Sequence, residues 1–247
     1  MKLISLDSVH STSSHLATIA ATAEQGIVVA AREQTAGRGQ RGNSWEAEPG
    51  KNLTFSLLLR PAGLRPARQF LISKAVAVAL ARVLSRRMGL EVRIKWPNDL
   101  YVADRKICGV LIESVLSGME IERTIVGVGI NVNQTEFRSD APNPVSMAQL
   151  TGHPYPLEPL LKELVEGVMA YFPRLCSDEG LQQELERDYH AMLWRREGFH
   201  PYRDNLKGTE MRSRIVSVAP TGMITLEDEA DGTLRTYAFK EISALLR

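Results

Sequence analysis

Short apolar runs separated by polar turns occupy the first two-thirds of the chain. They are rich in Val, Ile and Leu, which is typical of β-strands. The clearest run stops at Pro61, since proline cannot take part in the hydrogen-bond ladder of a central strand. The pattern predicts strands at residues 2–6, 27–34, 52–61, 92–96, 106–115 and 124–133.

A second spacing, with apolar residues three and four positions apart, predicts helices between and after these strands. Segment 66–88 has one largely apolar face that includes Lys74. Segment 157–172 carries a broad apolar stripe, which we expect to be core, and a further helix is expected at 181–195. Segment 11–26 predicts a helix that a hydroxyl residue caps and a glycine ends.

Beyond about Tyr202 the chain changes to short strands joined by tight turns. The expected strands span 210–220, 222–228 and 233–239. This pattern predicts a small β-barrel appended to an α+β domain. We therefore expect an α+β fold in two domains, residues 1–200 and residues 201–247.

The composition and the net charge limit the kinds of binding partner that this chain can recognise by charge. Apolar residues make up 44% of the 247 residues, enough for a sizeable core. The 30 basic and 29 acidic residues leave a formal net charge of +1. No general basic field therefore favours DNA or an anionic membrane, and any recognition by charge must be local.

Several classes of protein are disfavoured by the cysteines, the histidines and the first residues of the chain. Cys108 and Cys176 lie far apart, which predicts reduced thiols in a cytoplasmic protein, with Cys108 buried in an apolar strand. The scattered histidines argue against a histidine-based metal site, and the sequence contains no GxSxG motif that would indicate a serine hydrolase. The start does not resemble a signal peptide, and no apolar run approaches the ~18 residues of a membrane span.

The segment QTAGRGQRGNSW, residues 34–45, concentrates glycine and arginine after an apolar run. Ordering such a loop costs conformational entropy, which an anionic ligand would offset. Its glycines satisfy GxGxxG, but neither the required helix nor the acidic residue follows, and the spacing of a P-loop is absent. Two interpretations remain: a flap whose guanidiniums bind phosphate, or a solvated hairpin loop with Trp45 packed on the core.

Two further segments favour the first interpretation. The turn KWPNDL, residues 95–100, is followed by Lys106 at the head of an apolar strand, where a lysine either extends to solvent or faces a ligand. Gly109 and the two glycines of VGVGINVN, residues 126–133, lie inside strand patterns. Glycine at such positions marks either a bulge or the close approach of another group.

Together these segments resemble the biotin–protein ligases, also called biotin–[acetyl-CoA-carboxylase] ligases. GRGQRGNSW, KWPNDLYVADRKICGVLIE and VGVGINVN occur in the family's order and spacing, and STS at residues 11–13 resembles its STN motif. The resemblance implies a class II synthetase-like ligase domain, in which helices flank a mixed central sheet, and a small SH3-like C-terminal β-barrel.

The resemblance also implies a two-step reaction. ATP activates biotin to biotinyl-5′-AMP, and the biotinyl group passes to a lysine of a biotin carboxyl carrier protein or domain, with Mg²⁺ as the metal. Fixed cations would offset the repulsion between the biotin carboxylate and the triphosphate. The implied catalytic residues are Lys106, Asp99 and Arg41, and Asp99 is also the implied Mg²⁺ ligand. The implied biotin-binding residues are Ser11, Thr12, Ser13, Gln34, Gly37, Arg38, Gly39, Gln40 and Lys106. The implied ATP- or adenylate-binding residues are Arg38, Arg41, Trp45, Asn98, Lys106, Gly109 and Asn131.

The chain departs from the family pattern in places. Gln40 and Asn43 replace arginines of some members, and Ser13 replaces the asparagine of STN. Because the chain begins close to Ser11, we expect the form without the N-terminal DNA-binding domain of some members, and no specific DNA binding. A homodimer through sheet edges is compatible with the family. Two rival functions stay open, a ligase for lipoate and a non-enzymatic biotin sensor.

Overall fold

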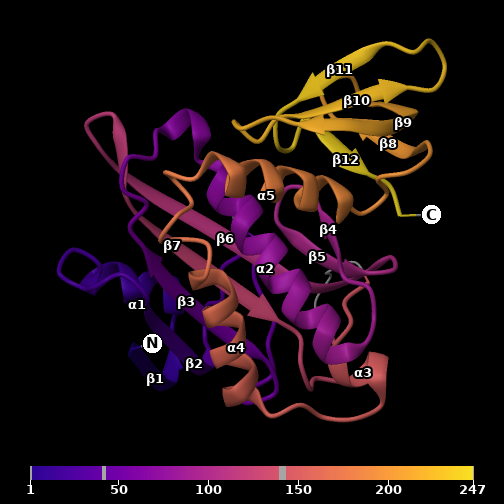
Figure 1. Ribbon diagram of the computed structural model, residues 1–247. Helices are drawn as coiled ribbons and strands as arrows, with labels where there is room; N and C mark the ends of the chain where they lie inside the picture. Colours follow the sequence, from indigo (N-terminus) through magenta and orange to yellow (C-terminus); the bar gives the residue numbers. More distant parts are fainter. Residues whose placement is uncertain (1, 41–42, 139–142, 247) are drawn as a thin grey trace.

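The computed structural model describes residues 2–40, 43–138 and 143–246 (Figure 1). A seven-stranded sheet forms its centre, with strand order β1-β2-β3-β7-β6-β5-β4. The strands are β1 (Lys2–Val9), β2 (Ile27–Gln34), β3 (Leu53–Leu59), β4 (Arg93–Lys95), β5 (Asp99–Val102), β6 (Arg105–Ser117) and β7 (Glu120–Ile130). β1 and β2 pair in parallel and the other neighbours are antiparallel. This arrangement confirms the predicted mixed sheet and α+β class.

The central strand β3 is buried on both faces, which explains its unbroken apolar run. Phe55 and Leu57 pack into the larger core with helices α2 (Phe70–Met88) and α4 (Leu157–Met169). Leu58 points the other way and packs with Leu16 of α1 (Thr12–Ile19). Because side chains alternate along a strand, one strand serves two cores. Figure 1 shows α2 and α4 crossing one face of the sheet.

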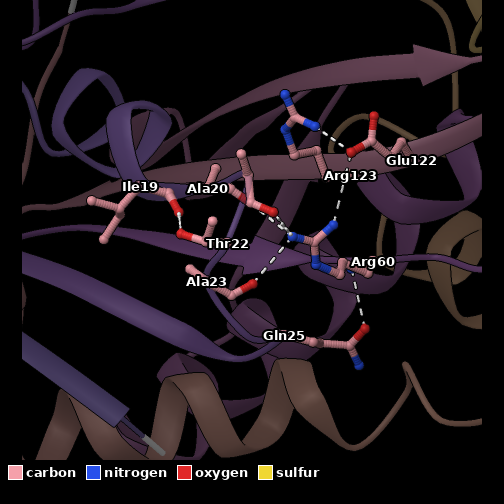
Figure 2. Close-up of polar contacts among 9 residues, drawn as sticks. Ile19, Ala20, Thr22, Ala23, Gln25, Arg60, Glu122 and Arg123 are labelled. Carbon is pink, nitrogen blue, oxygen red and sulfur yellow. Dashed lines mark hydrogen bonds and ion pairs between the residues drawn. The ribbon is translucent and has the colours of Figure 1, made fainter.

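The helix expected over 11–26 is wrong in its second half. α1 ends at Ile19, and residues up to Gly26, whose φ is 85°, form turns. Figure 2 shows the reason: the Arg60 guanidinium donates hydrogen bonds to the carbonyls of Ala20, Ala21 and Ala23, at 2.8, 3.2 and 3.1 Å. These carbonyls are satisfied from outside the helix, so the chain does not need to continue as one.

The other predicted helices shift at their ends. The 66–88 segment begins as a 3₁₀ turn (Pro66–Arg68) before α2, and helix α5 (Glu179–Ala191) begins at its cap Asp178 and ends earlier than expected. A short helix, α3 (Met147–Thr151), was not predicted and begins at a capping box of Ser146 and Gln149.

The C-terminal part forms a second, antiparallel sheet. Its order is β11-β10-β9-β8-β12. The strands are β8 (His200–Asp204), β9 (Thr209–Val218), β10 (Ile224–Asp228), β11 (Leu234–Tyr237) and β12 (Ile242–Ala244). The three expected strands are confirmed, and β8 and β12 were missed because they are short and partly polar. The SH3-like barrel and the domain boundary at 200/201 stay predictions.

This second sheet is joined to the rest by specific polar contacts. Lys74 of α2, which lies on the apolar face as expected, donates to both carboxylate oxygens of Glu186 (2.7 and 2.6 Å) and to the carbonyl of Val218 (3.0 Å). Trp96 Nε1 donates to the carbonyl of Gly222 at 2.9 Å. Figure 1 shows the C-terminal sheet at one end of the molecule beside α5.

Candidate functional site

A cavity of about 820 Å³ opens where the central sheet, α1, the 34–45 loop and the C-terminal sheet meet. Most of the residues predicted for the site line this one cavity. They are Ser11, Thr12, Ser13, Gln34, Arg38, Gly39, Gln40, Trp45, Asn98, Asp99, Lys106 and Gly109. Arg38 and Lys106 therefore lie on the same cavity, as the hypothesis of a cationic flap beside a strand lysine requires.

One end of the cavity is built from buried hydroxyl and amide groups. The carboxamide oxygen of Gln34 accepts from the backbone N–H of Thr12 at 2.8 Å and from its hydroxyl at 3.1 Å. Ser56 of β3 links this pair to the next residue, since its hydroxyl lies 2.8 Å from that of Thr12 and 2.9 Å from that of Ser13. Buried polar groups held in a network of this kind are positioned for a polar ligand.

The glycines of β6 and β7 have no side chains, so the side chains of Trp45 and Ser13 can lie close to the backbone of these strands. A Cβ at Gly129 would lie 2.6 Å from Trp45 Nε1, and one at Gly127 would lie 2.6 Å from Ser13 Oγ. A Cβ at Gly109 would lie 3.0 Å from Trp45 Cζ3. The irregularity in the β6–β7 pairing is at Val115/Leu116, away from Gly127 and Gly129, so close approach rather than a bulge explains these two glycines. Gly109 is approached by Trp45 as well, and the β5–β6 pairing also shifts register close to it, between Leu100 and Tyr101.

An ion pair between two of the three expected catalytic residues lines the cavity. Lys106 Nζ lies 2.8 Å from Asp99 Oδ1, and both side chains are partly exposed, 25% and 21%. The same ammonium lies 5.7 Å from the centre of the Trp45 ring. Asp99 pairs across the strands with Gly109, so the absence of a side chain there leaves room for the lysine.

The glycine–arginine loop folds back on itself. Gly39 N–H donates to the carbonyl of Asn43 at 2.7 Å, and Trp45 N–H donates to that of Gly37 at 3.0 Å. Arg38 forms an ion pair with Glu113 of β6 at 2.6 Å, with both side chains well exposed. Arg41 lies outside the described residues, so its expected role stays a prediction.

Two expected site residues do not line the cavity. Gly37 lies beside it, where a Cβ would meet the carbonyl oxygen of Trp45 at 2.6 Å. Asn131 is buried behind Lys106, and its backbone N–H donates to the carbonyl of Ile107 at 2.9 Å. Its place favours a role in holding the β6 strand rather than direct contact with a nucleotide.

Several residues of the site were missed in the sequence. Ser56, which lies behind the lining and contacts Thr12 and Ser13, was read only as part of an apolar strand, and these partners lie more than 40 positions away in the chain. Lys95 lies opposite Asp99 in the β4–β5 pair. Burial lowers the pKa of Lys95, against the opposing effect of Asp99, and Lys106 and Arg195 lower it further. The C-terminal sheet also contributes an apolar wall, which includes Ile215 and Phe239.

The site offers few metal ligands. Asp99 is the one carboxylate among the described lining residues. Across residues 2–40, 43–138 and 143–246, no cluster of three or more His, Cys, Asp or Glu side chains is placed to hold a metal ion. Such a site fits an ion bound mainly through substrate phosphates, as is usual for Mg²⁺, rather than an all-protein cage.

Among the residues that the structure describes, no helix is both long enough and apolar enough to cross a membrane.

Known proteins resemble this chain in sequence and in fold. The model of the Biotin/lipoate A/B protein ligase family matches residues 6–131, more than half of the chain. The Bacillus subtilis bifunctional ligase/repressor BirA is 37% identical over 113 residues, which is 45% of this chain and 34% of that protein. The Paracoccus denitrificans biotin–[acetyl-CoA-carboxylase] ligase is 38% identical over 130 residues, 51% of this chain and 54% of that protein. The matches thus span about a third to a half of these relatives.

The fold has a close counterpart among solved structures. The biotin protein ligase of Aquifex aeolicus, solved with biotin and ATP, superimposes with a TM-score of 0.79 over 98% of this chain and 97% of that chain. The two sequences are 22% identical, so this likeness concerns the fold. With the family match over residues 6–131, it shows that the chain belongs to the biotin/lipoate A/B protein ligase family.

Proposed function

We propose that this protein is an ATP-dependent, AMP-forming biotin–protein ligase. It activates biotin to biotinyl-5′-AMP and transfers the biotinyl group to a lysine of a biotin carboxyl carrier protein or domain. The observation that carries the proposal is that Thr12 and Gln34, which are hydrogen-bonded to each other, and the Lys106–Asp99 ion pair line the same cavity. The name of the Paracoccus denitrificans relative, which is 38% identical over the aligned residues, supports the choice of biotin.

In the first step, a carboxylate oxygen of biotin attacks the α-phosphorus of ATP. The bond from that phosphorus to the bridging oxygen breaks, and pyrophosphate leaves. Lys106 lies at the middle of the cavity, where its ammonium would offset the charge of the carboxylate and the α-phosphate. Arg38, on the loop, would add a second cation beside the forming adenylate. Asp99, the carboxylate among the described lining residues, would hold Mg²⁺, which would supply positive charge against the nucleotide phosphates.

In the second step, the amine of the acceptor lysine attacks the carbonyl carbon of the adenylate. The carbon–oxygen bond to AMP breaks, and the amine loses a proton as the amide forms. Asp99 lies 2.8 Å from Lys106, so its carboxylate is placed to orient the incoming amine beside the same cation. The buried hydroxyls of Thr12, Ser13 and Ser11 would bind the ureido group of biotin during both steps.

Release of pyrophosphate with ATP tests the proposal against its rivals. We expect release that depends on biotin, with lipoate giving none above background. A lipoate-specific ligase would reverse this result. A sensor that only binds biotin would give no pyrophosphate while still giving a calorimetric titration.

Removing the central cation tests the assigned chemistry. Lys106→Ala should lower the rate of adenylate formation by at least about 100-fold, since single charge-stabilising groups contribute on this order. Biotin binding should weaken, because Lys106 also faces the biotin carboxylate, but it should remain measurable because the hydroxyl cluster is untouched. Adenylate formation by this variant at the wild-type rate would show that Lys106 is misassigned.

The partners other than the carrier domain stay predictions. The expected absence of specific DNA binding, the possible homodimer and the cytoplasmic location are proposals of this kind. Gel-shift, sedimentation and fractionation experiments respectively would test them.

A further inference from the structure

Lys95 places a second lysine on the cavity, apart from the Lys106–Asp99 pair. It is the last residue of β4, it is half-buried, and it lines the cavity. Its ammonium donates to the hydroxyl of Tyr101 at 3.1 Å. It also lies over two aromatic faces, 4.8 Å from the ring centre of Tyr101 and 5.7 Å from that of Trp194.

This ammonium has no carboxylate partner among the residues that the structure describes. Sixteen ion pairs are present there, and Lys95 takes part in none. Asp99, the carboxylate opposite it, is paired with Lys106 instead. A half-buried cation without a counter-ion is costly, which is the reason its pKa is lowered. An anionic ligand would remove that cost.

The position of Lys95 in the sheet gives it a face and a direction. Directly opposite residues of an antiparallel pair share a face, so Lys95 and Asp99 point to the same side. Tyr101 lies two residues beyond Asp99 and opposite Lys106, because the β5–β6 pairing shifts register between Leu100 and Tyr101. This shift puts Lys106 on the same side as Lys95, Asp99 and Tyr101, and all four residues line the cavity. The two cations thus flank Asp99, with Lys106 next to Trp45 and Lys95 next to Trp194.

We propose that Lys95 binds the β- and γ-phosphates of ATP and then the departing pyrophosphate, while Lys106 serves the reacting α-phosphate. The inference rests on the proposed function and specifies which cation holds the leaving group. A triphosphate needs cations spaced along it, and the proposed function places Lys106 and Arg38 at the forming adenylate, which leaves the β- and γ-phosphates to another cation. Tyr101 and Trp194 hold the Lys95 ammonium, so the cation is positioned before the nucleotide arrives.

The two half-reactions separate Lys95 from Lys106. In Lys95→Met, kcat/KM for ATP in pyrophosphate release should fall by about 10- to 100-fold, the usual loss for a hydrogen bond to a charged group. Transfer from preformed biotinyl-5′-AMP to the carrier domain should stay within about twofold of wild type, because the pyrophosphate has already left. Inorganic pyrophosphate, titrated calorimetrically with Mg²⁺, should bind about tenfold or more weakly.

Two control variants show whether a loss of pyrophosphate affinity in Lys95→Met is due to the missing cation. Lys95→Arg keeps a cation and should recover most of the pyrophosphate affinity, whereas Lys162→Met removes an exposed lysine of α4 and should change nothing. Biotin affinity and the melting temperature show whether Lys95→Met is folded. Equal loss in both half-reactions, loss of transfer alone, or no loss at all would overturn the assignment.

The same assays distinguish the two levels of the proposal. If wild type releases no pyrophosphate with biotin, the proposed function itself fails. If wild type does so and Lys95→Met matches it, only the role of Lys95 fails.

Discussion

At the scale of single residues, the strand glycines decide how closely Trp45 can lie against the sheet. A Cβ at Gly129 would lie 2.6 Å from Trp45 Nε1, inside the range that real Cβ atoms avoid. At Gly109 the closest indole atom would be 3.0 Å away, and the next neighbour is the flexible end of Lys106 at 3.4 Å. A side chain would therefore clash with Trp45 more severely at Gly129 than at Gly109.

Alanine at these two glycines tests the indole contact. Gly129→Ala should lower the free energy of unfolding by about 1–3 kcal/mol, because overpacking a rigid indole strains the site. Gly109→Ala should cost less, since the lysine end can move. The tryptophan emission spectrum, with Trp45→Phe as the baseline, should shift in Gly129→Ala. Equal unfolding midpoints for both variants and wild type would contradict the observed packing of Trp45 on β7.

The charge on Lys95 gives a pH dependence. Its pKa is lowered from the usual 10.5, first by burial and then by Lys106 and Arg195, with Asp99 acting in the opposite direction. A lowered pKa means that the cation is lost as pH rises, beginning below the ordinary lysine range. Pyrophosphate affinity should therefore start to fall in that region. In Lys95→Arg the fall should begin at higher pH, and identical pH profiles of the two proteins would contradict this account.

At the scale of elements, the geometry of α1 depends on a residue at the end of β3. Arg60 donates from its guanidinium to three carbonyls after α1, and its backbone N–H donates to Gln25 Oε1 at 3.1 Å (Figure 2). A cation at the C-terminal end of a helix also interacts favourably with the negative end of the helix dipole. The other end of α1 carries Thr12 and Ser13, so Arg60 holds the helix that presents these hydroxyls.

Removing this clamp should loosen the hydroxyl end of the cavity. Arg60→Ala is expected to lower the free energy of unfolding by about 1–3 kcal/mol. It should also weaken biotin binding while the pyrophosphate affinity stays unchanged. Arg65→Ala, at a nearby exposed arginine, is the matched control and should be neutral. Loss of biotin and pyrophosphate binding to the same extent would indicate general unfolding instead.

The helices and strands also show which parts of the fold can be predicted from the sequence. The strand 52–61 was predictable because both faces of β3 are buried and the run is unbroken. The end of α1 was not predictable, because Arg60, which binds the carbonyls that follow the helix, is 40 residues away from Ala20. β5 was read as a turn because Asn98 and Asp99 favour turns, yet the chain has only Trp96, Pro97 and Asn98 between β4 and β5.

In the candidate site too, some residues could be predicted from the sequence and others could not. Lys106, Asp99 and the loop residues followed from the motif resemblance, and most of them line the cavity. Ser56 and Lys95 did not, because nothing local in an apolar strand or before a turn indicates their partners. Their roles depend on which segments the sheet brings together, and that is a tertiary property.

At the scale of the whole molecule, Lys74 joins the catalytic layer to the C-terminal sheet. Its ammonium is buried, with 1% of the side chain exposed, and Glu186, which holds it, is 45% exposed. The ring centres of Phe70 and Tyr189 lie 5.7 and 5.4 Å from it. Burial lowers the pKa of Lys74, and the Glu186 carboxylate works against that shift. Breaking this pair leaves a buried charge, whereas replacing the lysine does not.

Two substitutions should therefore differ in cost. Glu186→Ala should destabilise the protein by about 3 kcal/mol, and Lys74→Met should cost less, because no unpaired charge remains. The deficit of Glu186→Ala should shrink as pH rises, since the lowered pKa of Lys74 lets the unpaired ammonium lose its proton. Chemical denaturation at several pH values measures both effects. A larger cost for Lys74→Met than for Glu186→Ala would contradict this account.

The shared cavity makes one measurement the most direct test. The protein is incubated with biotin and ATP labelled at the α-phosphate, without any acceptor, and the bound species is identified by mass spectrometry. The account predicts about one biotinyl-5′-AMP per active site together with released pyrophosphate, and loss of the bound adenylate as AMP when a carrier domain is added. ADP with inorganic phosphate, or biotin bound without any adenylate, would contradict it.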